Sequence, residues 1–348
     1  MRRNPVKVLF ATFIILLGVV VPGRADQPLT KNPNYMNGRA QILEPGADPV
    51  IIAPTRDLVG ATVRSGRANL YLGTADNSNI IYRPNSPVIT SPKVQLIWYG
   101  TWIDSTSNTS PTAKNFQGFT TKFLYDLNNY LTKSNANPRW AMNNKYYQIN
   151  PDNSKVYVPL TFDFQSSKVV PRYTGKYKEP LSQSAIYQIA RDYIGSLINP
   201  DPSTIYVVLT SSDIKVNGFG TKFCGWHSYN QGNSMKYAFV GDPTSVSNCI
   251  PQTASPNKNP GADAMLSVLV HELEETMTDP QLNAWYDAKG KENADKCAWT
   301  WGSVNGDSTN GYYNLTLNGV PYLIQQGFAL STPSPSSPDT WSGICSMG

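Results

Sequence analysis

The sequence has 348 residues, with 29 lysines and arginines, 24 aspartates and glutamates, and a formal net charge of +5. Residues 1–25 hold four of the bases and none of the acids, so the rest of the chain is close to neutral. This balance argues against nucleic acid as a partner, because affinity for it requires clustered lysine and arginine, and the sequence has no such cluster.

The first 25 residues have the pattern of a secretory signal peptide. Arg2, Arg3 and Lys7 give a basic start. Residues 8–21 contain no charge, and small residues precede Asp26 at a suitable cleavage site. This apolar run is short for a bilayer, which requires roughly 20 residues. The sequence therefore predicts a secreted protein that is not embedded in a membrane, with a retained signal anchor as the alternative.

The remainder divides by composition into an arm and one domain. Residues 26–90 are rich in proline, asparagine and glycine and show no helical period, which predicts an extended N-terminal arm with a few edge strands. Residues 91–348 alternate between strand and helix patterns, and this predicts a single α/β domain with a mixed sheet. Strands are expected at 94–100, 156–164 and 205–209, helices at 113–131 and 183–197, and a polar surface loop at 332–338.

The segment His271-Glu272-Leu273-Glu274-Glu275 contains the candidate metal ligands and the candidate general base. Apolar residues at three- and four-residue steps predict a helix around it: Leu266, Leu269, Val270, Leu273 and Met277. His271 and Glu275 then share a face, as the two helical zinc ligands of zinc peptidases do, and Glu272 would be the general base on a water bound to the metal. Glutamate replaces the usual second histidine here. The motif predicts a zincin-like α/β domain with Zn²⁺ as cofactor.

A structural alternative applies to the same helix. Glu272, Glu274 and Glu275 are also compatible with a solvated acidic face, because carboxylates are common on exposed helix surfaces, with His271 as a semi-buried residue. Calcium is less favoured than zinc, since imidazole is a poor ligand for that hard ion.

The only other histidine, His227, follows Cys224 in the segment Cys-Gly-Trp-His-Ser, which we expect to be a loop pinned by the cysteine. With two histidines in the chain, a zinc site requires either both of them and a carboxylate, or His271 and two carboxylates. The sequence leaves both ligand sets open.

Four acidic residues downstream of the helix could supply the missing ligands: Asp279, Asp287, Glu292 and Asp295. Asp279 precedes Pro280, a pattern more typical of an N-cap that starts a new short helix. Glu292 and Asp295 lie just before Cys297 and are the better candidates, although a solvated turn is an equally good interpretation of each.

The four cysteines, Cys224, Cys249, Cys297 and Cys345, all lie in the last third of the chain. An even count in a secreted protein predicts two disulfides with three possible pairings, of which sequence proximity favours Cys224 with Cys249 and Cys297 with Cys345. Two sequons, at Asn108 and Asn314, predict glycosylated and therefore exposed segments.

Aromatic residues suggest a second kind of site, because sugar rings stack on exposed aromatic faces. The sequence groups the following candidates: Trp98, Tyr99, Trp102, Trp226, Trp285, Tyr286, Trp299 and Trp301. Burial in the core is the default for most of them.

Several motifs, in order along the chain, resemble the phosphate-induced protein family, also called EXORDIUM proteins. They are Ile-Trp-Tyr-Gly-Thr-Trp at 97–102, Cys-Gly-Trp-His at 224–227, the segments 256–265, 271–275 and 279–286, the E-x-x-D-x-C turn at 292–297, and the late pairs at 313–314 and 318–319. The family consists mainly of secreted plant proteins of the apoplast and cell wall. The resemblance implies an EXORDIUM-like domain over 91–348, an extracellular location and a link to growth or cell-wall physiology, but no settled reaction.

Two functions follow from these patterns. The first is a secreted metal-dependent hydrolase or peptidase, with His271 and Glu275 as ligands, a third ligand from Glu292, Asp295 or His227, and Glu272 as the base. The second is a non-enzymatic apoplastic protein that binds cell-wall polysaccharide or another extracellular protein and modulates growth.

Overall fold

The structure is a computed structural model that describes residue 43 and residues 47–63, 66–67, 69–102, 116–132, 138–170, 176–195 and 199–348. The predicted signal peptide, the arm at 26–42 and the sequon at Asn108 lie outside the described residues. None of the helices in the described part combines the length and the apolar character that a bilayer-spanning segment requires.

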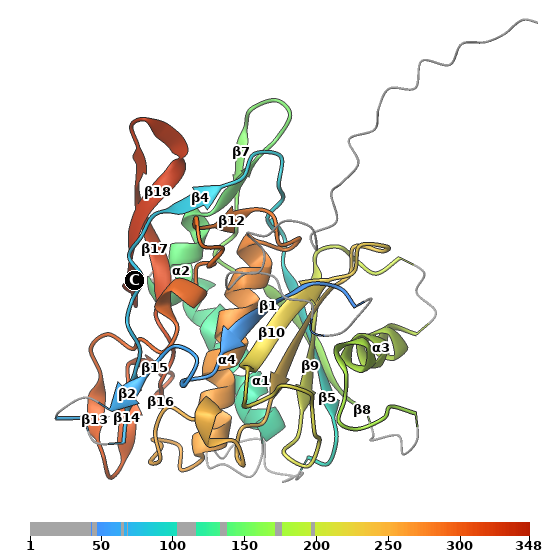
Figure 1. Ribbon diagram of the computed structural model, residues 1–348, viewed down its shortest axis with the longest axis vertical. Coiled ribbons are helices and arrows are strands. Elements are labelled where there is room, and N and C mark those ends of the chain that lie inside the picture. The colour runs from blue at the N-terminus through green and yellow to red at the C-terminus, as the bar shows by residue number, and fades with distance from the viewer. Residues whose placement is uncertain are drawn as a thin grey trace, which may run out of the picture.

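A six-stranded mixed sheet forms the centre of the molecule (Figure 1). Its order is β1 (Val50–Pro54), β10 (Phe223–Tyr229), β11 (Lys236–Gly241), β9 (Thr204–Thr210), β5 (Lys93–Tyr99) and β8 (Asp163–Val170). Strands β11, β9, β5 and β8 are parallel neighbours, whereas β10 is antiparallel to β11 and β1 is antiparallel to β10. Every residue of β9 is buried, as expected for a central parallel strand that is covered on both faces. The α/β class with a mixed sheet is confirmed.

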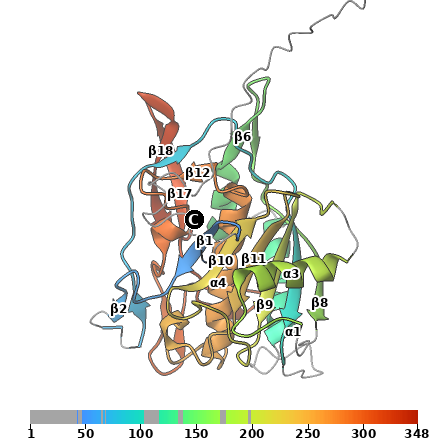
Figure 2. The same cartoon turned by 45° about the vertical axis from the view of Figure 1, so that its right-hand side comes forward.

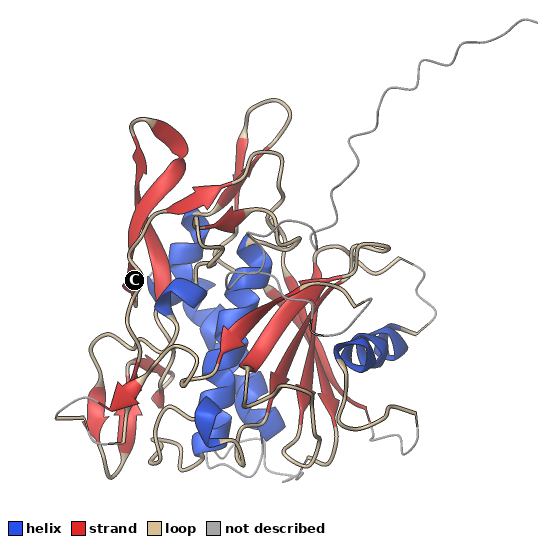
Figure 3. Ribbon diagram, viewed as in Figure 1, coloured by secondary structure: helices blue, strands red, loops and turns tan. Residues whose placement is uncertain are grey.

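Helices cover the two faces of this sheet, as Figures 2 and 3 show. Helix α4 (Pro260–Thr278) and α1 (Phe116–Thr132) lie on one face and α3 (Gln183–Ile194) on the other. Shorter helical turns are α2 (Pro138–Ala141), η3 (Met142–Lys145), η4 (Ser247–Cys249) and η5 (Asp295–Cys297).

A second, four-stranded sheet packs near the chain end. Its order is β12 (Trp285–Tyr286), β4 (Ile80–Tyr82), β18 (Ser337–Ser346) and β17 (Gly327–Ser334). Four two-stranded pairs complete the described part: β2 (Thr62–Val63) with β3 (Tyr71–Leu72), β6 (Tyr147–Ile149) with β7 (Lys155–Tyr157), β13 (Asn305–Asp307) with β14 (Gly311–Tyr313), and β15 (Leu315–Leu317) with β16 (Val320–Tyr322).

Helix α4 positions the candidate site, and its ends follow from the sequence. The Asn259 side chain accepts a hydrogen bond from Ala262 N–H, and Pro260 occupies the first turn, where a missing N–H costs nothing. Every residue from Gly261 to Thr278 is buried. A helix surrounded on all sides must find partners for its polar side chains inside the protein.

Two sequence expectations about elements are corrected. The strand expected at 156–164 is two strands, β7 and β8, separated by a segment that contains Pro159. The expected loop at 332–338 belongs to the β17–β18 hairpin, whose two-residue turn lies at 335–336. Edge strands are expected within 26–90, and β1 is one of them: it is a buried edge strand of the central sheet.

Both disulfides join the segments that frame the site. Cys224 is bonded to Cys249 and Cys297 to Cys345, the pairing that sequence proximity favours. The first links β10 to η4, and the second links η5 to β18.

Candidate metal centre

His271 and Glu275 lie one turn apart on α4, and their side chains meet as the spacing predicts. His271 Nε2 is 3.3 Å from Glu275 Oε1, and both residues are buried. The solvated acidic face is wrong, because Glu272, Glu274 and Glu275 are each 0% exposed.

His227 reaches the same cluster from strand β10. Its Nδ1 is 3.1 Å from Glu272 Oε2 and 3.6 Å from Glu275 Oε2. The expectation that His227 lies in a loop is wrong: it pairs with Ile51 on β1 and with Ala238 on β11, in the interior of the sheet.

Asp295 and Glu292 complete the cluster from the segment before Cys297. His271 Nε2 is 3.6 Å from Asp295 Oδ1, and His227 Nε2 is 3.5 Å from Glu292 Oε2. The backbone N–H of Asp295 also donates to Glu275 Oε1 at 2.8 Å, which fixes this segment against the helix. All six residues of the expected site therefore converge: His227, His271, Glu272, Glu275, Glu292 and Asp295.

Two overlapping trios within the cluster have the geometry of metal ligands. They are His227, Glu272 and Glu275, and His271, Glu275 and Asp295, and within each trio the ligand atoms lie within 4.8 Å of one another. Two ligands held about 2.0–2.1 Å from a tetrahedral zinc ion are about 3.3–3.4 Å apart. The imidazole-to-carboxylate distances of 3.3 and 3.6 Å around His271 are close to that value and longer than most hydrogen bonds.

Unsatisfied polar atoms support the fit of a cation. Both ring nitrogens of His271, Glu272 Oε1 and Glu275 Oε2 are buried and have no hydrogen-bond partner among the described residues. Buried polar atoms without partners are costly and rare in native proteins. A divalent ion would satisfy several of them at once, and nitrogen with carboxylate oxygen is a donor set that zinc accepts.

Burial and mutual charge shift the titration of these groups in the chain without metal. Burial lowers the pKa of His227 to about 3, with a further contribution from the neighbouring His271. Burial alone would lower the pKa of His271, but Glu275 and Asp295 raise it well above its ordinary value. Burial and the Asp295 charge raise the pKa of Glu275 to about 7, and burial raises that of Glu272 strongly.

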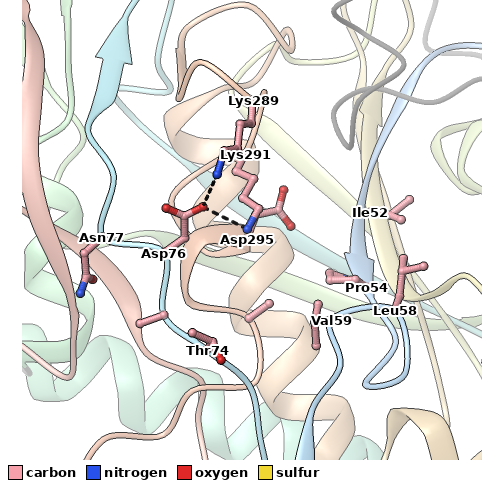
Figure 4. Close-up of a pocket in the computed structure, with 12 residues that line it drawn as sticks. Ile52, Pro54, Leu58, Val59, Thr74, Asp76, Asn77, Lys289, Lys291 and Asp295 are labelled. Carbon is pink, nitrogen blue, oxygen red and sulfur yellow. Dashed lines mark ion pairs between the residues drawn. The ribbon is translucent and has the colours of Figure 1, made fainter.

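A cavity of about 590 Å³ lies beside the cluster, and Asp295 forms part of its wall (Figure 4). Figure 4 shows the Asp295 carboxylate directed toward Ile52 and Pro54 of β1. Other apolar contributions come from Leu58, Val59, Ala75 and Ala298. Lys289 and Lys291 line the same cavity and are paired with Asp76. Asp295 is therefore the member of the cluster that borders this cavity.

The pocket residues before position 78 were missed by the sequence analysis. They belong to the expected arm, where no motif marks them. Their only sequence signal is the apolar run around Ile52, which fits any edge strand equally well.

The remaining acidic candidates serve other roles. Glu274 binds Arg139 and Asn143 on a flank of the helix next to the cluster. Asp279 is the C-cap of α4, and its carboxylate accepts from the N–H groups of the next turn at 283–284, so it does not start a new helix. Asp287 accepts from backbone N–H groups of its own turn and from Lys296 Nζ.

The expected aromatic and glycan features are largely structural. Six of the eight aromatic candidates are buried: Trp98, Tyr99, Trp226, Trp285, Trp299 and Trp301.

The amide of Asn314, the asparagine of the second sequon, donates to the carbonyls of Trp301 and Ile324, and its oxygen accepts from Ile324 N–H. A glycan on this amide nitrogen would replace one of its two hydrogens, so at most one of the two donated bonds would remain.

Comparison with known proteins places these motifs in a family. The model of the phosphate-induced protein 1 conserved region matches residues 85–319. Protein EXORDIUM-like 3 of Arabidopsis thaliana is 27% identical over 265 residues, which cover 68% of this chain and 74% of that protein. Protein PHOSPHATE-INDUCED 1 of Nicotiana tabacum is 26% identical over 305 residues, with coverage of 76% and 89%. No solved structure matches with significance.

Proposed function

The chain belongs to the phosphate-induced protein 1 family, whose conserved region spans both histidines, and we propose that this member is a secreted, zinc-dependent hydrolase with a zincin-like site. The observation that carries the proposal is the convergence of His271, Glu275 and Asp295, of which Asp295 lines a cavity. The preferred reaction is hydrolysis of a peptide bond.

Each residue would have a distinct task. A bound zinc ion would polarise the scissile carbonyl group and lower the pKa of a water molecule. His271, Glu275 and Asp295 would hold the ion. The hydrogen bond from the Asp295 backbone N–H to Glu275 Oε1 would fix the position of Asp295 relative to Glu275. Glu272 would accept a proton from the attacking water and deliver it to the amine nitrogen as the carbon–nitrogen bond breaks.

The cavity supports a substrate that approaches past Asp295. Its apolar wall, made by residues such as Ile52, Pro54 and Val59, favours an aliphatic or aromatic side chain next to the scissile bond. Lys289 and Lys291 at the same cavity are positioned to meet a carboxylate of the substrate, although Asp76 already partly neutralises them.

The test is a peptidase screen of the zinc-loaded protein with internally quenched peptides, beside a Glu272→Gln variant. We expect activity in the wild-type protein and a loss of about 100-fold or more in the variant, because general-base catalysis contributes about that much. A variant that stays folded, keeps its zinc and retains full activity would remove Glu272 from the mechanism.

The complete burial of Glu272 and Glu275 favours a second candidate, in which the same ion stabilises a non-enzymatic extracellular protein. Chelation would then lower the melting temperature while no peptide in the screen is cleaved. The family relationship supports growth or cell-wall physiology for this candidate, with a polysaccharide or an extracellular protein as partner.

We also propose that the chain is secreted to the apoplast or cell wall. Both disulfides support this location, because they persist in oxidising compartments. Mass spectrometry of the culture medium of an expressing plant cell line would show a mature chain that begins near Asp26. Detection of the full-length chain in the cytosol alone would contradict it.

A further inference from the structure

We infer that the cluster holds two divalent cations, bridged by Glu275, with the second ion bound by His227, Glu272 and Glu275. This inference rests on the proposed metal site and adds a second site to it.

The first observation is the orientation of Glu275, whose two carboxylate oxygens face different histidines. Oε1 lies 3.3 Å from His271 Nε2, whereas Oε2 lies 3.6 Å from His227 Nδ1. A carboxylate with one oxygen in each trio has the arrangement of a bridging ligand, as found where two metal ions lie about 3.5–4 Å apart.

The second observation is the charge of the cluster. Four carboxylates, those of Glu272, Glu275, Glu292 and Asp295, surround two imidazoles. Two buried cations among the described residues bind carboxylates outside the cluster: Arg139 binds Glu274 and Lys296 binds Asp287. One divalent ion would neutralise half of the negative charge of the four ionised carboxylates, whereas two ions would neutralise all of it. Buried charges are stable only when they are paired in this way.

The third observation concerns the other nitrogen of His227. Its Nε2 lies 3.5 Å from Glu292 Oε2, an ion-pair distance rather than a hydrogen bond. In the proposed arrangement, Glu292 would accept the proton on Nε2 and leave the Nδ1 lone pair for the ion. A carboxylate behind a ligating imidazole is the usual support for a metal-bound histidine. Glu292 is therefore a positioning residue in this arrangement.

Glu272 would serve both parts of the site through its two oxygens. Oε2 is 3.1 Å from His227 Nδ1 and belongs to the second trio, whereas Oε1 has no hydrogen-bond partner among the described residues. Oε2 would bind the second ion, and Oε1 would remain as the proton acceptor.

Metal stoichiometry of the signal-cleaved full chain tests the inference. The protein is stripped with a chelator, dialysed against Zn²⁺ and measured by inductively coupled plasma mass spectrometry. The variants are His227→Ala and, as a matched control, Asp263→Asn, which alters a buried carboxyl group of the same helix outside the cluster. We expect two zinc ions per chain in the wild type and the control, and one in His227→Ala.

The alternative outcomes separate the two proposals. One ion in the wild type, unchanged in His227→Ala, would overturn the second site and leave the proposed hydrolase intact. No ion in the wild type would overturn both. If His227→Ala does not fold, titration of the wild type with Co²⁺ followed by electron paramagnetic resonance decides the question. Spin coupling that develops with the second equivalent supports the pair, and its absence contradicts it.

Discussion

At the level of single residues, Gly225 determines how closely strand β10 approaches helix α4. A Cβ atom at this position would lie 2.7 Å from Val268 Cγ1 and 2.9 Å from Glu272 Oε1. Both contacts are too short for real carbon atoms, and the neighbouring backbone carbonyl of Phe239 leaves no room on the third side. The glycine two residues before His227 therefore lets the histidine of β10 and the carboxylates of α4 share one site.

We expect Gly225→Ala to lower the free energy of unfolding by about 1–3 kcal/mol, the usual cost of overpacking a buried site, and to weaken zinc binding. Urea denaturation and a competition titration with a zinc indicator measure the two effects. Gly232→Ala is the control, because its Cβ would meet only the Asn230 side chain. Equal behaviour of the two variants would contradict the role of Gly225.

Asp263 gives a pH prediction that is separate from the metal ligands. It is buried in the first turn of α4, where Ser255 and Asn257 donate to its carboxylate, yet burial raises its pKa to about 6. The unfolded carboxyl group releases its proton near its ordinary value of 3.8. The folded protein holds more protons between these values, so this contribution to stability is present at low pH and is lost as the pH rises.

Relative to Asp263→Asn, the wild type should lose up to about 3 kcal/mol of unfolding free energy between about pH 3 and pH 7. Chemical denaturation of both proteins across this range, in the presence of a chelator, measures the difference. Parallel stability curves would show that the carboxyl group is ionised normally in the folded protein.

The residue types of the site could be predicted from sequence, but their contacts only in part. Helical spacing is sufficient to bring His271 and Glu275 together, and the chelating pair follows from local geometry alone. The contact of His227 with the helix depends on strand order and on a glycine that carries no local signal. The sequence also could not decide whether Glu292 or Asp295 lies beside the histidines. In the structure both do: Glu292 lies next to His227 and Asp295 next to His271.

At the level of elements, α4 is held in place by an ion pair on the flank of the helix next to the metal ligands, because Glu274 lies three residues after His271 and one before Glu275. Arg139 of α2 forms two hydrogen bonds to the Glu274 carboxylate, one of 2.7 Å from Nη2, and a third from Nε to the Gln325 carbonyl. The two side chains are 2% and 0% exposed. Removal of one partner leaves a buried charge without compensation.

We expect Arg139→Met to cost about 3–5 kcal/mol of unfolding free energy, and the double variant with Glu274→Met to recover much of this loss. Lys93→Met, which breaks the exposed pair with Asp201, is the control and should cost much less, because solvent screens this pair. Urea denaturation gives all three values. An Arg139→Met cost as small as that of the control would mean that the pair does not anchor the helix.

Element types were easier to predict than their boundaries. Continuous apolar runs identified β5 and β9, because buried parallel strands have no polar face. The β17–β18 hairpin was missed, since its serine- and proline-rich turn region is more typical of a loop than of paired strands. The edge strand β1 gave only a short apolar signal, and its place beside β10 depends on tertiary pairing.

At the level of the whole molecule, the disulfides connect the site to distant parts of the chain. Cys297 lies two residues after Asp295, and its bond to Cys345 attaches this segment to the C-terminal strand β18 across 48 residues. The cluster is therefore assembled from the central sheet, the buried helix and a segment fixed by a crosslink. A site built from three parts should respond to the loss of any one of them.

We expect replacement of both Cys297 and Cys345 by serine to cost about 4 kcal/mol of unfolding free energy, the chain-entropy value for a loop of this length. Zinc affinity should fall in parallel, because Asp295 loses its support. Thermal denaturation and zinc titration measure both quantities. Unchanged zinc affinity in a folded double variant would show that the crosslink does not position the ligands.

We propose that the buried histidine and carboxylate cluster is a metal centre. An anomalous difference map, recorded from crystals of the zinc-loaded protein at the zinc absorption edge, tests it most directly. A zinc ion in the cluster would give a peak about 2.0–2.2 Å from His271 Nε2, Glu275 Oε1 and Asp295 Oδ1. A map with no peak in the cluster, or with zinc only at surface carboxylates, would contradict it.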